Sequence, residues 1–348
     1  MKHDRILGSI SCIRPTIVMI QKSLLTIILF ITLYSHATAQ VRTIELPDHI
    51  FLSAPQFVAN EKHFGILDPS QKKFFLFDYE SASLISKLDA TDSFPGFKWN
   101  PIRAEFLENE VFFTNSMPWG VYISYDNKVT HVAGRHFKAT GAYDFLNDSL
   151  YVGFYTERFE DPALKGVDRD GNIVIEFEEV PIRFPNLAYR SEERNHVLFL
   201  DDTIYLMTAF DNWLHTFSTD GHLLKSSELK IDGFRSPTRD KRRIEPGNMQ
   251  AMMHEFIQVT RDRSSVAGFY ALNSKEILIV SHAGYESNDK FVIISKFNVD
   301  TGNVDSKWTS RSTQPAFAQN DKVYFMDIES EPVIVRIVPM AEYWESLD

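Results

Sequence analysis

The stretch Asn147-Asp148-Ser149-Leu150-Tyr151-Val152 decides the fold, because it joins a turn-forming pair to a short apolar strand and recurs along the chain. Asn and Asp side chains hydrogen-bond their own backbone and tolerate left-handed conformations, so each such pair predicts a tight turn before the strand. The strand parts of the six copies are 63–67, 110–113, 149–152, 203–206, 276–279 and 322–325. Outside one insertion they recur roughly every 45 residues, the size of a four-stranded propeller blade.

A second turn signal follows the third strand of four copies. The four segments are 125–128, 169–172, 219–222 and 300–303. Asp-Gly and Thr-Gly pairs within them predict hairpin turns that need positive φ. The neighbouring runs 172–177 and 291–294 are rich in β-branched residues and predict strands buried on both faces. We therefore predict an all-β chain that forms a six-bladed β-propeller of four-stranded blades.

The two ends of the repeat region predict how the ring closes. The last copy supplies only about three strands, the final one over 333–338, whereas the apolar segment 41–46 belongs to no copy. Pairing these two segments would complete the sixth blade and remove two exposed strand edges. We expect the N-terminal strand to close the last blade.

One insertion, residues 232–263, interrupts the repeat. Its first part carries a basic run over 239–243, which we interpret as a solvated loop; contact with phosphate or acidic glycans is the alternative. Its second part has apolar residues at helical spacing after Asn248, a plausible helix N-cap. These residues are Met249, Met252, Met253 and Phe256. The insertion therefore predicts a short helix packed on the propeller.

Repeat length, blade number and turn pattern resemble those of the TolB-like and NHL-like six-bladed propellers, especially uncharacterised secreted members from Bacteroidetes. The resemblance covers roughly residues 41–339 and implies the fold, while functions within such propellers vary widely. No repeated WD, YWTD or kelch signature is present, which disfavours those subfamilies.

The first forty residues predict export. Lys22 precedes an apolar run over 24–33, and Ala37-Thr38-Ala39 is a small-x-small cleavage signal. We predict a signal peptide over 1–39 and a single propeller domain over 40–348, located in the periplasm or outside the cell. Residues 1–18 are interpreted as an upstream extension before a true start at Met19, and an uncleaved anchor is the alternative. Cys12 is the only cysteine, so cleavage would leave none.

The charge balance narrows the classes of partner. The 36 Lys and Arg against 47 Asp and Glu give a net charge of -11, which disfavours binding to nucleic acid or to anionic membranes. No His or carboxylate set has metal-ligand spacing, and Asp168-Arg169-Asp170-Gly171-Asn172 is better explained as a hairpin turn than as a calcium loop. We expect a monomer with no cofactor, no metal and no membrane insertion after cleavage.

The longer loops of the predicted propeller lie on one face, and they carry aromatic and basic residues suited to binding. The loop candidates are Trp119, Tyr155, Arg158, Trp213, His282 and Tyr285. Packing of these aromatics within their own loops is the alternative interpretation. Near the first strands, Arg103, Tyr189 and Arg190 are candidates to face the central axis, with Glu105 or Asp144 as carboxylates.

These candidates support two hypotheses of function. The first is a noncatalytic binding propeller that recognises a glycan, a peptide or a protein partner on its long-loop face. The second is a secreted hydrolase or lyase with its site at the mouth of the central channel, which would require converging carboxylates or metal ligands. The absence of GxSxG, HExxH and Gly-rich phosphate motifs favours the first.

Overall fold

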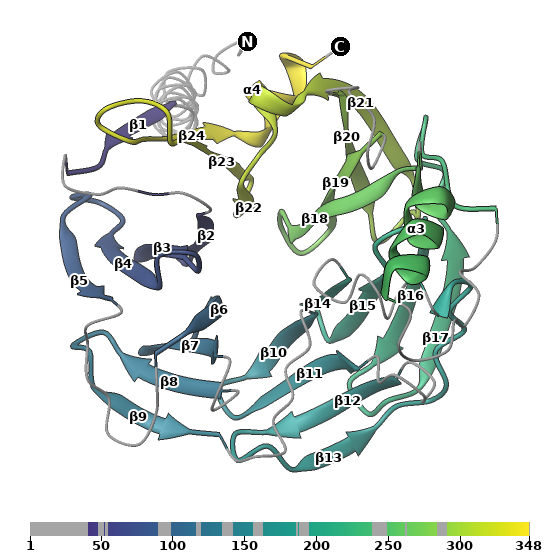
Figure 1. Cartoon of the computed structure of the whole chain (residues 1–348), viewed down its shortest axis with the longest axis horizontal. Helices are drawn as coiled ribbons and strands as arrows, with labels where there is room; N and C mark the ends of the chain where they lie inside the picture. Colours follow the sequence, from purple (N-terminus) through teal and green to yellow (C-terminus); the bar gives the residue numbers. More distant parts are fainter. Residues whose placement is uncertain are drawn as a thin grey trace, which may run out of the picture. The chain divides into compact units, whose positions relative to one another are not determined.

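Six antiparallel sheets of four strands each are arranged as blades around a common centre (Figure 1). The computed structural model describes residues 41–47, 52, 55–89, 99–115, 120–133, 142–155, 163–185, 187, 195–238, 249–261, 263–283 and 291–347. Residues 43–348 pack as one compact unit. The predicted six-bladed β-propeller is confirmed.

Each blade runs from an inner strand at the ring centre to an outer strand at the rim (Figure 1). Blades 1 to 3 comprise β2 (Gln56–Ala59), β3 (His63–Asp68), β4 (Lys73–Asp78), β5 (Leu84–Leu88); β6 (Pro101–Phe106), β7 (Glu110–Asn115), β8 (Gly120–Ser124), β9 (Val129–Val132); and β10 (Tyr143–Asn147), β11 (Leu150–Tyr155), β12 (Ala163–Asp168), β13 (Ile173–Glu176). Blades 4 to 6 comprise β14 (His196–Leu200), β15 (Thr203–Met207), β16 (Trp213–Ser218), β17 (Leu223–Glu228); β18 (Ser265–Ala271), β19 (Glu276–His282), β20 (Phe291–Asn298), β21 (Val304–Ser310); and β22 (Phe317–Gln319), β23 (Lys322–Asp327), β24 (Ile334–Pro339), β1 (Arg42–Glu45).

Two of the predicted Asn-Asp and Asp-Asp turns have positive φ, whereas Asn147-Asp148 does not. Both residues of the Asp201-Asp202 and Asn320-Asp321 pairs have positive φ, between 49° and 57°, as a type I′ hairpin requires. Gly221 has a φ of 98° in the turn from β16 to β17, and the carbonyl oxygen of Glu176 lies 2.8 Å from where a Cβ would sit. A side chain at Gly221 would therefore be strained by its backbone and would also collide with the neighbouring blade.

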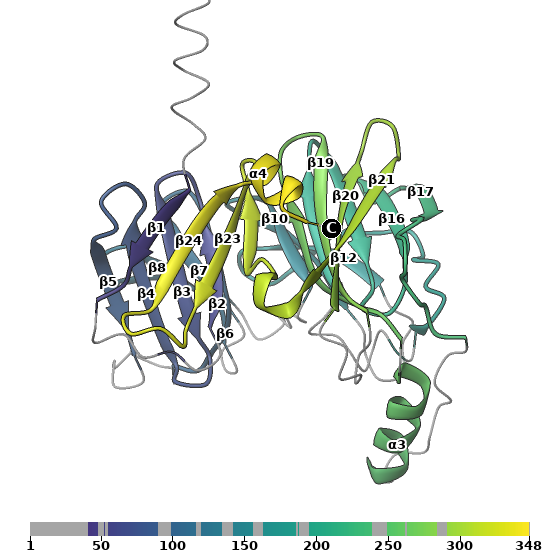
Figure 2. The ribbon, with the colours of Figure 1, turned by 90° about the horizontal axis from the view of Figure 1, so that it is seen from above.

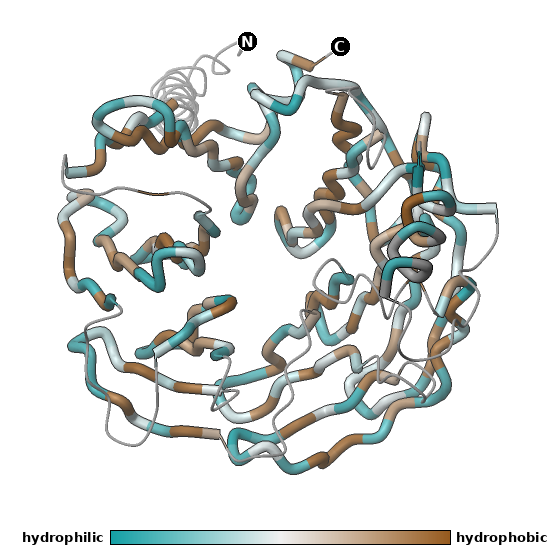
Figure 3. The backbone as a smooth tube through the Cα atoms, in the orientation of Figure 1, coloured by the Kyte–Doolittle hydropathy of each residue, from teal (hydrophilic) through white to brown (hydrophobic). Residues whose placement is uncertain are grey.

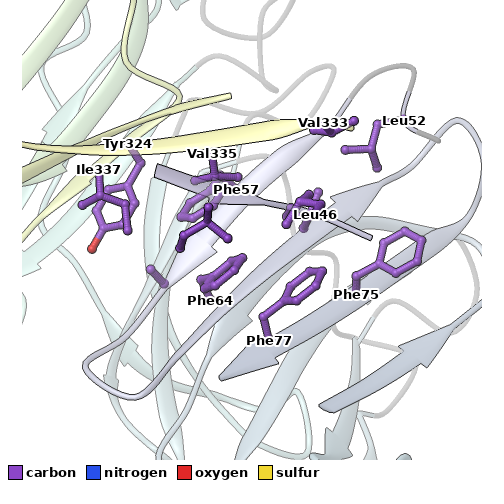
Figure 4. Close-up of a cluster of buried hydrophobic side chains, with 13 residues drawn as sticks. Leu46, Leu52, Phe57, Phe64, Phe75, Phe77, Tyr324, Val333, Val335 and Ile337 are labelled. Carbon is purple, nitrogen blue, oxygen red and sulfur yellow. The ribbon is translucent and has the colours of Figure 1, made fainter. Parts of the chain in front are cut away.

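The N-terminal strand closes the ring as predicted. Strand β1 is the outermost strand of blade 6 and lies beside β24, and the backbone N–H of Leu46 donates to the carbonyl of Val333 at 2.9 Å. Beneath this closure, apolar side chains of blades 1 and 6 form a continuous cluster that includes Phe57, Phe64 and Tyr324 (Figure 4). The cluster ties the two ends of the ring together by burying aromatic surface on both sides of the last blade interface.

Apolar side chains of adjacent blades pack together between the blades. Hydrophobic and hydrophilic stretches alternate along the chain around the ring (Figure 3). The second strands are mostly buried, as in β19, where Ile277, Leu278 and Ile279 are fully covered. Inner strands such as β10 and β14 are only partly buried. The run 172–177 differs from the prediction of burial on both faces, because β13 is an outer strand. Ile173 and Val174 are 51% and 55% exposed there.

Two helices extend beyond the blades. Helix α3 (Met249–Thr260) projects from one face of the ring, whereas α4 (Met340–Glu345) lies toward the opposite face (Figure 2). The predicted helical insertion is thus confirmed, and Phe256 packs against Phe210 with ring centroids 5.8 Å apart. The basic run 239–243, Asn248 and the methionine side chains of the predicted stripe lie outside what the structure describes. Helix α4 and the short 3-10 turn Arg311–Thr313 were not predicted.

Candidate functional site

Polar side chains from four inner strands meet at the ring centre, and Arg103 on β6 is the one that links them. Its guanidinium interacts electrostatically with Glu105, Tyr143, Asp144, His196 and Tyr270, which come from blades 2, 3, 4 and 5. The side chains of Arg103 and Glu105 remain 34% and 29% exposed. The side chains of Arg103 and Glu105 at the ring centre are therefore still in contact with solvent.

Arg103 is held in a defined orientation by an aromatic platform. Its Cζ lies 4.5 Å from the ring centroid of Tyr143, within the range of a cation–π interaction. Tyr143 is itself only 1% exposed and packs edge-on against Phe112 and Phe145 at 5.7 and 6.1 Å. Because Tyr143 cannot move without disturbing blades 2 and 3, the guanidinium above it is preorganised.

Glu105 lies beside Arg103 without a close ion pair. The nearest atoms, Nη2 of Arg103 and Oε2 of Glu105, are 3.7 Å apart, longer than the 2.7–2.9 Å typical of a charge-assisted hydrogen bond. Burial raises the pKa of Glu105 to about 7; the negative charge of Asp144 adds to this increase and the positive charge of Arg103 opposes it. Glu105 therefore changes its protonation near neutral pH, despite the adjacent cation.

Asp144, also near Arg103, holds backbone N–H groups of two blades. One carboxylate oxygen accepts a hydrogen bond from the N–H of Phe145 at 2.8 Å, and the other accepts one from the N–H of Phe199 at 2.6 Å. The second bond connects β10 of blade 3 to β14 of blade 4. Burial raises the pKa of Asp144 to about 6, although both hydrogen bonds and Arg103 act in the opposite direction.

Two further groups near Arg103, His196 and Tyr270, are neutral at neutral pH. Burial, followed by the positive charge of Arg103, lowers the pKa of His196 to about 4. Burial raises the pKa of Tyr270 to about 12, and its hydroxyl donates to the carbonyl of Ala316 at 3.2 Å. Gly268 makes room for this ring, because a Cβ there would lie 2.5 Å from the Tyr270 side chain.

Three of the loop candidates lie within the described residues, and they lie in three different blades. Tyr155 is not an exposed loop residue: it ends β11, is 7% exposed, and its hydroxyl lies 3.0 Å from that of Tyr151. Trp213 begins β16 and lies half-buried near Arg183, whose Cζ is 5.7 Å from its ring centroid. His282 ends β19, with Nε2 2.9 Å from Oε1 of Gln314. The other candidates, Trp119, Arg158, Tyr285, Tyr189 and Arg190, lie outside the described residues.

A second polar cluster surrounds Trp213. Asp211 is 2% exposed and lies 3.4 Å from Nη1 of Arg183, whose Cζ is also 5.1 Å from the Phe184 ring centroid. Burial raises the pKa of Asp211 to about 6, while Arg183 and backbone hydrogen bonds lower it. The cluster secures the β15–β16 connection, and the Arg183 side chain stays 41% exposed.

Sequence reasoning named Arg103, Glu105 and Asp144, and the structure brings these three together. It missed Tyr143, His196 and Tyr270, which complete the site. One signal would have found them: each lies on the strand that precedes one of the six repeated segments, and those strands form the ring centre. Within the described ranges, no three His, Cys, Asp or Glu side chains are close enough to hold a metal ion.

Comparison with known proteins identifies a shared fold. A member of the DUF4221 family from Bacteroides vulgatus has a TM-score of 0.60 and 10% sequence identity, with 86% of this chain and 96% of that chain covered. A "Putative exported protein" from Bacteroides fragilis has a TM-score of 0.58 and 10% identity, with 87% and 96% covered. A protein of unknown function from Bacteroides thetaiotaomicron reaches 0.51 at 8% identity, with 86% and 75% covered.

At 8–10% sequence identity, these proteins share the fold with this chain. No family model matches the chain, and no curated protein matches it. The resemblance to exported propellers from Bacteroidetes is thus confirmed at the level of architecture. No helix among the residues described is long and apolar enough to cross a membrane.

Proposed function

We propose that this protein is an exported, noncatalytic propeller that binds a polar ligand at the centre of its ring, with Arg103 as the principal contact. The observation that carries the proposal is the accessible guanidinium of Arg103, fixed over the buried ring of Tyr143 at 4.5 Å. A preorganised donor loses little conformational freedom when a ligand binds, and this favours affinity. The apolar run and small-x-small signal before Gln40 support export, as does the likeness to the Bacteroides fragilis protein.

The ligand site of the proposal differs from the long-loop face that the sequence favoured. Of the loop candidates within the described chain, Tyr155 is buried in a strand and Trp213 is half-buried against Arg183. Neither offers the accessible platform of a sugar or peptide site. The inner strands, by contrast, place one cation and one titrating carboxylate within reach of solvent.

The geometry favours binding over carboxylate-pair catalysis. A pair of catalytic carboxylates needs two groups free to exchange protons with a substrate or with water. Both oxygens of Asp144 are engaged by backbone N–H groups, and this leaves Glu105 as the single candidate among the described residues around Arg103. Hydrolase or lyase activity remains the second candidate function, because a glutamate with a pKa of about 7 is suited to general acid–base catalysis.

Screening the purified protein on glycan and peptide arrays, followed by calorimetry of each hit, tests the proposal. We expect Arg103→Gln to weaken binding by about tenfold or more, as loss of a charge-assisted contact implies. Arg169→Gln is the matched control, because Arg169 also stacks on a buried tyrosine, at 4.1 Å from the Tyr122 centroid, away from the inner strands. Hits that bind Arg103→Gln as tightly as the wild type would refute the site.

The same hits separate binding from catalysis. Each is incubated with the protein, and its products are followed by mass spectrometry. We expect every ligand to be recovered unchanged. Turnover that disappears in Glu105→Gln would establish the second candidate function instead.

A further inference from the structure

Ile102 lies on the innermost strand of blade 2 and is unusually exposed for such a position. The residue is 45% exposed and directly precedes Arg103 on β6, at the ring centre (Figure 1). Within the part of the chain that the structure describes, the other large apolar residues that are exposed lie on outer strands or at the ends of strands. Ile102 therefore offers apolar surface to water beside the proposed ligand site.

A β-bulge holds Ile102 in this exposed position. The pairing of β6 with β7 changes register between Pro101 and Arg103, so that Ile102 is an extra residue on β6. The carbonyl oxygen of Ile102 accepts a hydrogen bond from Nε2 of Gln56, which opens β2 of blade 1, at 3.0 Å. Because its backbone is anchored to the neighbouring blade, Ile102 can meet a ligand without rearrangement.

Gln56 adds a polar group beside Ile102. Its Nε2 donates to the carbonyl of Ile102, so its Oε1 is an additional acceptor on an exposed side chain. An apolar surface next to an amide acceptor matches a peptide residue that has an apolar side chain, because the N–H of that residue can donate to the acceptor. A sugar ring carries hydroxyl groups on most of its carbons and presents little apolar surface to an isoleucine.

We infer that the ligand of the ring centre is a peptide segment, with an apolar side chain packed on Ile102 and a backbone N–H that donates to Oε1 of Gln56. This inference rests on the proposed function and adds the class of ligand and a specificity-determining residue. Neither contact involves the guanidinium of Arg103. Packing a ligand on an exposed isoleucine removes apolar surface from water, and loss of about two methyl or methylene groups from such a contact lowers affinity about tenfold.

Ile85 on β5 provides a matched control for Ile102. It is also the extra residue of a β-bulge, because the pairing of β4 with β5 changes register between Leu76 and Phe77, and it is 43% exposed. It differs in lying on the outer strand of blade 1, away from the ring centre (Figure 1). Truncation of either isoleucine removes similar apolar surface, so an effect confined to Ile102→Ala reports contact with the ligand.

The experiment uses peptides whose ends carry no charge. N-acetylated peptide amides are arrayed with each position varied among glycine, serine, leucine and phenylalanine, and calorimetry with the full protein measures the dissociation constants of the best sequences. We expect the wild type to bind peptides with leucine or phenylalanine at one position at least about tenfold more tightly than those with glycine or serine there. This preference should fall to about twofold or less in Ile102→Ala and persist in Ile102→Leu and Ile85→Ala.

Two further probes test the peptide backbone. Methylation of the backbone nitrogen of the preferred apolar residue removes its N–H, and we expect binding about threefold to tenfold weaker. Gln56→Lys keeps a donor for the carbonyl of Ile102 and removes the acceptor, so this variant should bind both forms of the peptide equally. Octyl glucoside supplies an apolar chain without a peptide bond, and its binding should not depend on Ile102. Circular dichroism checks that each variant is folded.

Five results separate the inference from the proposed function. Binding that depends on Arg103 but shows no preference for an apolar residue would refute the inference and leave the proposed function in place. A preference that survives in Ile102→Ala, or that is lost equally in Ile85→Ala, would refute the role of Ile102. Equal binding of the methylated peptide by the wild type would refute the contact with Gln56.

The last two results concern the class of ligand and the site itself. Binding of octyl glucoside as tight as that of the peptide, and equally dependent on Ile102, would refute a peptide as the ligand. Peptide binding that depends on Ile102 and is unchanged in Arg103→Gln would support the peptide class and refute Arg103 as the principal contact.

Discussion

Blades 2 and 3 are joined by two arrangements built from the same residue types. At the ring centre, Arg103 of blade 2 stacks on Tyr143 of blade 3 beside Glu105. Toward the rim, Arg169 of blade 3 stacks on Tyr122 of blade 2 beside Glu110. Both tyrosines are buried, and the two arginine side chains are 34% and 30% exposed.

The two arrangements differ in the carboxylate. Glu110 contacts Arg169 directly and is only 13% exposed, and Arg169 also donates to Oγ1 of Thr130 at 3.3 Å. Glu105 stays 3.7 Å from Arg103 and is 29% exposed. Arg169 and Glu110 form a direct contact that links neighbouring blades, whereas Arg103 and Glu105 lie on the same strand and their nearest charged atoms stay 3.7 Å apart. Residue type alone therefore does not distinguish a structural arginine from one suited to a ligand.

Removal of Asp144 gives the largest expected effect. Asp144→Ala leaves two partly buried backbone N–H groups without their acceptor, and each unsatisfied group costs about 1–3 kcal/mol. We expect a loss of about 2–4 kcal/mol in the free energy of unfolding, measured by guanidinium denaturation at pH 7. A loss below about 1 kcal/mol would show that Asp144 does not clamp blades 3 and 4 and is available for chemistry.

A double-mutant cycle measures the difference between the two arginines. For Arg169→Gln and Glu110→Gln, we expect a coupling of about 1–2 kcal/mol in the free energy of unfolding, because the pair is in contact and partly buried. For Arg103→Gln and Glu105→Gln, we expect about 0.5 kcal/mol or less at pH 7, since the pair is open and Glu105 is partly protonated. Equal coupling free energies for the two pairs would show that Arg103 and Arg169 do not differ in how strongly each interacts with its glutamate.

The smallest effect concerns the pH dependence of stability. The native pKa of Glu105, about 7, is above the ordinary value of 4.5, so the native state favours the protonated form. The charged form then destabilises the fold as pH rises through this interval. Glu105→Gln should be more stable than the wild type by about 1 kcal/mol at pH 8, and the gain should vanish near pH 4. Chemical denaturation at both pH values measures it, and an equal gain at both would contradict the raised pKa.

Much of the fold could be predicted because its signals are local. The Asp201-Asp202 and Asn320-Asp321 pairs adopt the positive φ values that their side chains tolerate, and each comes directly before the next strand. Helix α4 could not be predicted in this way, because it is short and held by tertiary contacts. Met340 and Tyr343 are buried against the blades, and Nζ of Lys307 donates to the carbonyl of Trp344 at 2.9 Å.

The candidate site was predictable only in part. Arg103 was named as a candidate because it lies near a predicted first strand, where a side chain can face the axis, and Asp144 was named as a possible carboxylate there. Their different roles depend on Phe199 and Tyr143, which lie in neighbouring blades, and the spacing of residues along the chain does not show such contacts. Tyr155 illustrates the opposite error: the repeat placed it in a loop, whereas β11 continues through it and buries its ring.

The closure of blade 6 also bears on how the protein forms. Strand β1 comes from the beginning of the described chain and β24 from its end, so the ring is complete only when both are present. During synthesis, β1 has no β24 to pair with until the later blades have been made. Its short length of four residues limits the exposed edge during that interval. The hydrogen bonds between β1 and β24 can therefore form only after the last strand of the ring has been made.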